Sequence, residues 1–239
     1  VVMNFLQLSQ RLVQECGVTG VLSTTAGVTG EQLRITSWIN SAWNDLQTRR
    51  NDWQWMRSSV LLGGGVSFAT VAGQAVYPLG SGAGTVGITA SVFGKWAQDS
   101  FRCNTTTVGF TDEIYMDPID YDAWRNAYMY GALRSVQTRP VAVAIAPDKS
   151  ICVGPPSNGL YTVTGDYYRA PLQMSSDTDE PTGLPAQYHM AIVYNAMMMY
   201  AGYEAASEVF QRGQAGYDRM MSELDTIQGP VVFAAGALA

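Results

Sequence analysis

The sequence predicts an α+β fold, in which both chain ends form an antiparallel helical bundle and a strand-rich region with one short helix is inserted between them. Apolar residues recur at helical spacing near both ends of the chain. In the middle, runs of Val, Thr, Phe and Tyr are broken by glycines and lack that period, which favours short strands and turns. We therefore expect a helical bundle from residues 4–55 plus 185–228, and an inserted β-rich domain at residues 57–175.

The first half of the bundle is expected to contain two helices. The first runs from Asn4 to Cys16 and meets Gly17, a residue type that commonly ends helices. The second spans about 20 residues after Thr29, which forms a capping-box pattern with Gln32. Its apolar face advances in steps of three and one, close to an ideal helical pattern: Ile35, Trp38, Ile39, Ala42, Trp43 and Leu46.

The inserted region is expected to begin with short strands and turns, and to return to strands as a small meander at residues 140–170. Between them, a short helix is predicted to open with Asp117 as its N-cap and Pro118 in its first position. Asp120 and Asp122 would then lie in the first turn, where the helix dipole favours negative charge.

The helix expected to begin at Pro185 is apolar on all sides, which indicates burial by more than one neighbour. Because no Asp, Glu, Lys or Arg occurs from Pro181 to Tyr203, a membrane span is an alternative. Polar residues and a glycine favour a central bundle helix instead: Gln187, His189, Asn195 and Gly202. A last helix follows, with these residues toward the core: Tyr217, Met220, Met221, Leu224 and Ile227.

The charge balance argues against a dedicated nucleic-acid-binding protein. The chain has 14 Lys plus Arg against 20 Asp plus Glu, a net charge of −6, and no basic cluster. Tight binding requires cations that neutralise phosphates, so we expect no sequence-specific DNA binding, although DNA could slide past the surface. Charged residues make up 14% of the chain, against about 25% in a typical protein, which suggests a surface covered by further copies.

The cysteines, Cys16, Cys103 and Cys152, are odd in number and far apart, and the chain contains one histidine. This pattern favours reduced, partly buried thiols in a cytoplasm over a zinc site. The N-terminal residues lack the basic segment and the cleavage site of a signal peptide, so none is expected.

One glycine pattern, Gly82-x-Gly84-x-x-Gly87, matches the dinucleotide-binding fingerprint. That chemistry needs a helix to follow, so that its N-terminus faces the pyrophosphate. The residues that follow, ITASVF, favour a strand, so a flexible loop is expected and no cofactor site.

Acidic residues of the middle region could hold a divalent cation if they converged in space. Helix capping accounts for three of them, so no metal site is expected at this group: Asp112, Glu113, Asp117, Asp120 and Asp122. The later acidic loop, with Asp177, Asp179 and Glu180, is expected to be solvated.

His189 is expected to be a structural histidine near a helix start rather than a general base. Consecutive residues of a helix point about 100° apart, so the run Met197–Met199 cannot converge on one ion and is expected to pack. We therefore expect no catalytic residue and no enzymatic activity.

The stretch TRRNDWQWMR offers a possible base-stacking surface through Trp53 and Trp55, flanked by Arg49, Arg50 and Arg57. The favoured interpretation is that the two tryptophans pack at the junction of helix and sheet while the arginines face water.

The last residues, 229–239, contain no charged side chain, no amide and no hydroxyl. This apolar tail is too short to span a bilayer, which needs roughly 20 apolar residues. Gly229 and Pro230 separate it from the preceding helix.

Two long segments carry a resemblance to a known family. The opening FLQLSQRLVQECGVTG, followed by GEQLRITSWINSAWNDLQTRRNDWQWMRSS, resembles the start of head-to-tail adaptor (connector) proteins of tailed bacteriophages. The later run GDYYRAPLQMSSDTDEPTGLPAQYHMAIVYNAMMMYAGYEAA, with FQRGQAGYDRMMSELDTIQGP, is similar to their C-terminal helices. The strand-rich middle matches only loosely, in APDKSICVGPP.

The resemblance implies a structural protein of the virion neck, assembled in the host cytoplasm. It implies a homo-oligomeric ring, usually dodecameric, under the portal protein. The ring would continue the channel for double-stranded DNA and give a tail or nozzle protein its platform, without a membrane or a cofactor. The C-terminal segments of such proteins commonly reach the portal, so the expected portal-binding residues are Pro230, Val231, Val232, Phe233 and Leu238. The alternative is a phage-tail binding module that recognises a glycan or receptor through the β-rich middle.

Overall fold

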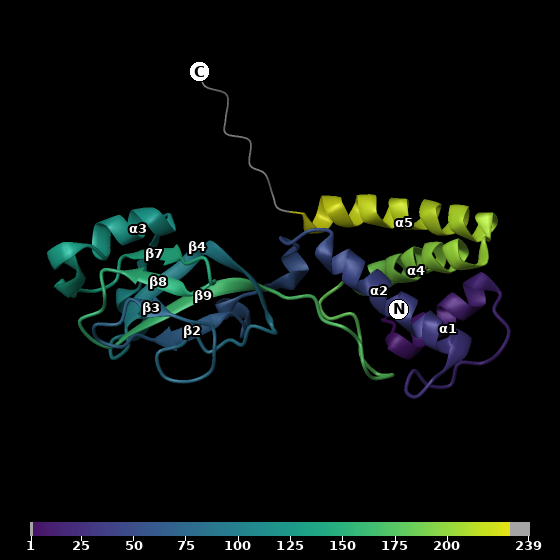
Figure 1. Ribbon diagram of the computed structural model, residues 1–239, viewed down its shortest axis with the longest axis horizontal. Coiled ribbons are helices and arrows are strands. Elements are labelled where there is room, and N and C mark those ends of the chain that lie inside the picture. The colour runs from purple at the N-terminus through teal and green to yellow at the C-terminus, as the bar shows by residue number, and fades with distance from the viewer. Residues whose placement is uncertain (1, 230–239) are drawn as a thin grey trace, which may run out of the picture. The chain divides into compact units, whose positions relative to one another are not determined.

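A computed structural model describes residues 2–229 of the chain (Figure 1). The described part contains five α-helices and two β-sheets, with strands in the middle and helices towards both ends, so the α+β prediction is confirmed. The chain divides into two compact units. The helical unit comprises the chain up to Met56 and from Pro171 onward, and the β unit is Arg57–Ala170.

The helical unit is built around one central helix. Its helices are α1 (Phe5–Cys16), α2 (Gly30–Thr48), α4 (His189–Glu204) and α5 (Ser207–Gln228). Helix α4 contacts each of the other three and lies beside α5 (Figure 1). It buries the consecutive residues Ala191, Ile192 and Val193, so more than one of its faces is covered. No helix in the described part is long and apolar enough to cross a membrane.

Two glycines allow α5 to lie close against α4. A Cβ atom on Gly213 would lie 2.9 Å from the carbonyl oxygen of Tyr194, and one on Gly216 would lie 2.8 Å from the Tyr194 ring. Both distances are shorter than the normal separation of about 3.5–4.0 Å. Glycine lowers the intrinsic helix propensity of α5, and the contact with α4 explains why it is required at both positions.

The two N-terminal helices begin differently. In α1, Gln7 N donates to Asn4 Oδ1 at 2.9 Å and Asn4 N donates to Gln7 Oε1 at 3.0 Å, which is a complete capping box. The capping box predicted for α2 is wrong. Thr29 is the N-cap residue, but its side chain makes no cap hydrogen bond. Gln32 Nε2 donates instead to the carbonyl oxygen of Val21, because the preceding loop folds back over the helix start.

The segment that returns from the β unit is held by amide side chains of α2. Gln47 exchanges two hydrogen bonds of 2.9 Å with the backbone of Leu172. Asn40 does the same with Met174, at 2.9 and 3.0 Å. Each amide pairs with a backbone N–H and a carbonyl as a neighbouring strand would, so the segment after Ala170 packs with the helical unit.

The β unit contains two sheets. Its strands are β1 (Arg57–Ser58), β2 (Val66–Ala69), β3 (Val76–Tyr77), β4 (Phe93–Thr105), β5 (Ile114–Tyr115), β6 (Asp117–Pro118), β7 (Ala142–Ile145), β8 (Ile151–Gly154) and β9 (Tyr161–Arg169). One sheet has the order β1-β9-β4-β5, with β2 also paired to β9, and the other has the order β3-β8-β7-β6. All pairs are antiparallel except β6 with β7.

The two sheets share one apolar core, to which β4 contributes Phe101 and Cys103 and β8 contributes Ile151 and Val153. The short helix α3 (Tyr121–Tyr128) covers a second, smaller cluster through Trp124. Arg102 and Thr164, which alternate with core residues along β4 and β9 and pair with each other, lie on the opposite face of the β1-β9-β4-β5 sheet.

The short helix begins three residues later than predicted. Asp120 is the N-cap, and its Oδ2 accepts a hydrogen bond from Asp122 N at 3.0 Å. Asp117 and Pro118 form β6 instead, parallel to β7. The backbone N–H of Asp117 donates to Val141 O at 2.8 Å, so pairing with the second sheet overrides the local capping pattern.

Candidate functional site

The C-terminal end of α5 is anchored to the end of α2 by a small polar cluster, the tail root, made of Arg50, Asp52, Gln54, Asp225 and Gly229. The Arg50 guanidinium bridges Asp52 at 3.0 Å and Asp225 at 3.4 Å. Hydrogen bonding to Asp52, with a smaller contribution from Asp225, raises the pKa of Arg50. Gln54 Nε2 donates to the carbonyl oxygen of Gly229 at 2.9 Å.

Gly229 is buried, and no side chain fits there. A Cβ atom at this position would lie 2.5 Å from the carbonyl oxygen of Asp225 and 3.3 Å from the Arg50 guanidinium. The chain therefore leaves the helical unit at a fixed point. The predicted portal-binding residues, Pro230, Val231, Val232, Phe233 and Leu238, lie outside the described residues.

The two candidate base-stacking tryptophans are part of the helical unit's interior. Trp53 is fully buried, donates from Nε1 to Leu46 O at 3.0 Å, and stacks on Trp55. Trp55 also stacks on Trp43, with ring centroids 5.4 Å apart. The prediction that these tryptophans pack is confirmed, and the contacts that the structure shows lie inside the helical unit.

The arginines of the same stretch have partners of their own. Arg49 lies over the ring of Tyr217 at 5.9 Å, and Arg50 belongs to the tail root. Arg57 lies in the β unit and pairs with Asp166 at 2.9 Å. The stretch therefore divides between internal contacts of two units.

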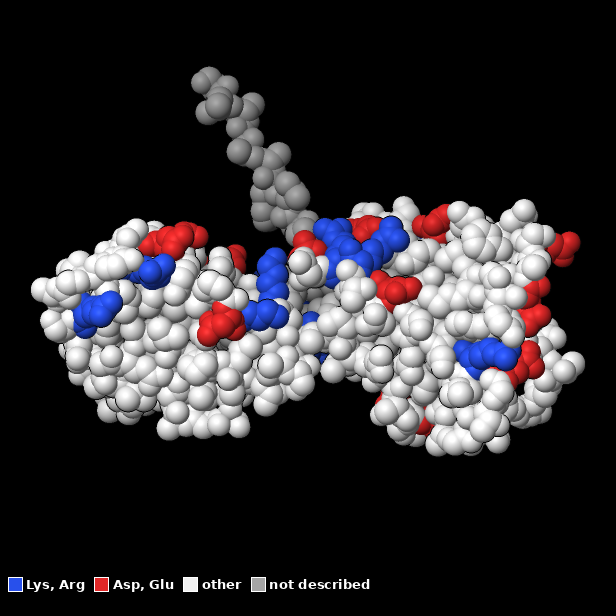
Figure 2. Space-filling view, viewed as in Figure 1, with Lys and Arg blue, Asp and Glu red and all other residues white. Residues whose placement is uncertain are grey.

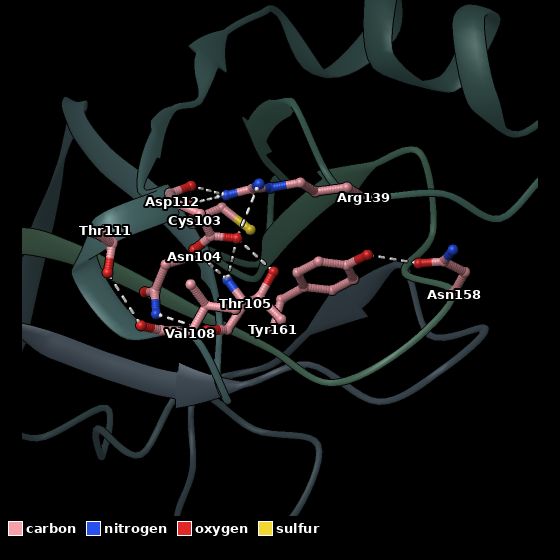
Figure 3. A network of polar contacts seen from close by, with 9 residues as sticks. All are labelled: Cys103, Asn104, Thr105, Val108, Thr111, Asp112, Arg139, Asn158 and Tyr161. Carbon is pink, nitrogen blue, oxygen red and sulfur yellow. Dashed lines mark hydrogen bonds and ion pairs between the residues drawn. The ribbon is translucent and has the colours of Figure 1, made fainter.

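Asp112 lies at the centre of a polar network (Figure 3). Its carboxylate accepts hydrogen bonds from Thr105 N at 3.0 Å and Thr105 Oγ1 at 2.5 Å, and it pairs with Arg139 at 3.2 Å. These bonds, the Thr105 side chain foremost, hold the pKa of Asp112 below its usual value. Arg139 also donates to Cys103 O at 2.8 Å. The network ties the segment before β7 to β4, and nothing local in the sequence indicated it.

The other acidic residues of the middle region do not converge on Asp112. Asp120 caps α3, Asp122 pairs with Arg125 at 3.5 Å, and Glu113 and Asp117 are exposed. In the part of the chain that the structure describes, no group of three His, Cys, Asp or Glu residues is placed to hold a metal ion.

The later acidic loop is more than a solvated charge cluster. Asp177 accepts hydrogen bonds from Thr24 Oγ1 at 2.8 Å and from Thr25 N at 2.6 Å. Asp179 accepts from the backbone N–H groups of Ser175 and Ser176. Hydrogen bonds of this kind lower the pKa of both carboxyls, so the expectation of purely solvated charge is wrong for these two residues.

The remaining candidates are structural. Gly82, Gly84 and Gly87 lie in a loop that leads into β4 and not into a helix. His189 is buried, and its Nδ1 accepts from Met3 N at 3.1 Å while Nε2 faces Leu184 O at 3.1 Å, so the structural interpretation is confirmed.

The cysteines are free thiols, as predicted, and Cys103 and Cys152 are buried. Burial raises the pKa of Cys16 and of Cys152 to about 12, so both thiols are mainly protonated at neutral pH.

On the surface shown in Figure 2, charged side chains are sparse, the two signs are interspersed, and uncharged atoms predominate.

The comparison with known families identifies the class of adaptor. Residues 3–234 match the SU10 adaptor protein family, so the chain belongs to that family and is a structural adaptor protein of a bacteriophage. Membership implies association with portal and tail components at the virion neck. The match includes the strand-rich middle, where the sequence alone gave only a loose resemblance. No curated protein matches the chain.

Proposed function

We propose that this adaptor forms a dodecameric ring under the portal, extends the DNA channel, and supplies the platform to which the tail attaches. The observation that carries the proposal is the family match over residues 3–234. In this proposal the adaptor acts as a structural component, without catalysis and without a cofactor. The net charge of −6 suits a channel wall, because DNA must pass without being held.

We further propose that the apolar tail binds the portal. The tail root supports this proposal, because it fixes the point at which the chain leaves the helical unit. Burial of Val231, Val232, Phe233 and Leu238 at about 25 cal/mol per Å² would contribute several kcal/mol per copy before ordering costs. Repetition around a ring converts such contacts into an effectively permanent attachment.

Co-purification with the portal protein of the same phage tests both parts. The tagged chain is compared with a truncation after Gly229, with a variant carrying Val231→Ser, Val232→Ser and Phe233→Ser, and with Ala234→Ser as a matched control. We expect the full chain and the control to retain the portal, and the other two to bind at least about tenfold more weakly.

The outcomes separate the two parts. Equal binding by all four proteins would leave the adaptor role intact and disprove the role of the tail. Failure of the full chain to bind, together with glycan binding by the isolated β unit, would favour the tail binding module. We also expect the free chain to be monomeric in dilute solution, since a ring should await its template; a stable ring of the purified chain in sedimentation would contradict this.

A further inference from the structure

The turn between β1 and β2 presents two leucines to solvent. Leu61 is 94% exposed and Leu62 is 88% exposed. The turn is nevertheless firmly held, because Leu62 N donates to Ser59 O at 3.1 Å and Val60 N donates to the Asp166 carboxylate at 3.0 Å. A braced turn that holds large apolar side chains in water is a feature of an interaction surface.

Glycines make this turn as tight as it is. Gly65 has a φ of +70°, and a Cβ atom there would lie 2.5 Å from Val60 N and 2.8 Å from Gly165 O. Its N–H donates to Ser58 Oγ at 2.9 Å. The backbone can reach this position only without a side chain, so the two leucines are held in a fixed place above β9.

A trough of about 650 Å³ lies beside the turn on the outer face of the sheet. Leu61 and the 74% exposed Phe110 are its largest apolar lining residues, and Arg102 and Thr164 also line it. Its charged lining residues are three carboxylates and two guanidinium groups: Asp99, Glu113, Asp166, Arg57 and Arg102.

The charges that remain unneutralised in the trough are mainly negative. Asp166 and Arg57 pair with each other, whereas Arg102 lies over the neutral ring of Tyr115 at 4.6 Å and keeps its positive charge, so two carboxylates and one guanidinium remain. Asp99 and Glu113 are exposed and have no ion-pair partner among the described residues. A partner that fits the trough should therefore be apolar and carry positive charge.

The β unit also carries a partly exposed segment that is apolar and positively charged. We call this segment, residues 130–136, the projection. Tyr130, Leu133 and Val136 are each 47–48% exposed along a short 3-10 turn, Gly131–Ser135. Arg134 is the one charged residue of residues 130–136. The segment that follows is fixed beside the second sheet, where Thr138 pairs with Ser157, and the projection shares no residue with the trough.

We propose that the projection of one copy, led by Leu133 and Arg134, docks into the trough of the next copy between Leu61 and Phe110. This inference rests on the proposed ring, and it names the contact between ring subunits. Two different surfaces of one chain that fit each other give a head-to-tail contact, which is the type that closes into a ring. The apolar side chains provide the affinity, and Arg134 opposite Asp99 and Glu113 sets the orientation.

Cysteine cross-linking tests the contact with and without the portal. Leu61→Cys and Leu133→Cys are made separately in full-length chains that carry Cys16→Ser, with a different tag on each. Val21→Cys, at an 83% exposed apolar position of the helical unit, is the matched control. A short bis-maleimide should join the Leu61→Cys and Leu133→Cys chains to each other at least tenfold more than it joins either chain to itself or to the control.

A charge exchange provides the second arm. With the portal present, where the ring is expected to form, Arg134→Glu and Glu113→Arg should each reduce association between copies by about tenfold or more. The double variant should restore it, because both changes then meet at every contact. Arg134 and Glu113 are both exposed, so these variants should keep the wild-type unfolding temperature.

Several results would overturn the contact. These are cross-links only between identical chains, no mixed cross-link in either condition, or additive losses in the double variant. Portal co-purification of the wild-type chain is a separate readout. Portal binding without the mixed cross-link would reject this contact and keep the adaptor role. A mixed cross-link without portal binding would support this contact and reject the adaptor role.

Discussion

The helical unit and the β unit use their apolar residues in opposite ways. Helix α4 is apolar on every side, yet α1, α2 and α5 of the same chain cover it. The turn at Leu61 and Leu62 has far fewer apolar atoms than α4. It nevertheless holds these two side chains in solvent, because backbone hydrogen bonds fix the turn. The difference teaches that an interface is indicated by where apolar residues are left exposed, and not by how apolar a segment is.

This comparison changes one interpretation of the sequence. An all-round apolar helix such as α4 would also fit a subunit with neighbouring copies on both sides. Its contacts within the chain account for that burial, so α4 gives no support to oligomerisation. The exposed turn of the β unit, and not α4, supports contact between copies.

The largest effect should come from Trp53→Ala in the helical unit. Trp53 is fully buried, hydrogen-bonded to Leu46 O and stacked on Trp55, so its removal leaves a cavity and should cost about 3–5 kcal/mol. The matched change Leu61→Ala in the β unit should alter stability by less than about 0.5 kcal/mol. Urea unfolding of both variants measures the difference in their free energies of unfolding. Similar losses of stability in the two variants would contradict this prediction.

Gly65→Ala should have the next largest effect and links stability to assembly. The new methyl group meets Val60 N and Gly165 O, and the positive φ is strained for alanine, so we expect a cost of about 1–3 kcal/mol. Self-association should fall as well, because the leucines would move. Gly82→Ala, in a loop with open space around the glycine, is a control for backbone strain alone. Retained self-association in a measurably destabilised Gly65→Ala protein would show that the turn does not position the contact.

The helices were largely predictable from sequence, because their determinants are local. The 3.6-residue period of the apolar face placed α2, and a left-handed glycine ended α1 where expected. Strands β7, β8 and β9 fall within residues 140–170 as predicted, and β7 pairs with β8. The predicted meander is nevertheless wrong, because β9 belongs to the other sheet and pairs with β1, β2 and β4. Residues close in the chain decide the helices and the β7–β8 pair, but not the place of β9.

The features that escaped prediction depend on distant residues. Asp112 and Arg139 are 27 positions apart, and no local pattern links them. The exposure of Leu61 depends on Asp166, more than one hundred positions away, and on the bare backbone of Gly165. A sequence that reads as leucines beside glycines is equally consistent with a buried strand end. Pairing with β7 likewise decided that Asp117 begins a strand and not a helix.

A smaller effect should confirm which aspartate caps α3. Asp120→Ala removes the acceptor for Asp122 N and should cost about 1 kcal/mol. Asp117→Ala should cost almost nothing, because only the backbone of Asp117 pairs and its side chain is exposed. Thermal unfolding of the two variants would show the difference, and a larger loss for Asp117→Ala would restore the original capping prediction.

The smallest effect concerns His189, the one histidine of the chain. Burial lowers its pKa, and because Nδ1 accepts the hydrogen bond from Met3 N, the ring is held neutral with its proton on Nε2 toward Leu184 O. Glu180 is the charged side chain that faces it, and favours the protonated form only weakly. The unfolded chain, with an ordinary pKa of about 6.5, therefore binds a proton at a higher pH than the folded chain does.

Stability that depends on neutral His189 should be complete above about pH 7 and should fall as the pH drops below about 6.5 toward the lowered pKa of the folded state. Asp177 and Asp179 have lowered pKa values and do not titrate in this window. His189→Asn keeps an acceptor near Met3 N but removes the titration, so its unfolding temperature should change less between pH 7.5 and 5.5 than that of the wild type. Parallel pH profiles for the two proteins would mean that protonation of His189 is tolerated, and that Met3 N is held by other contacts.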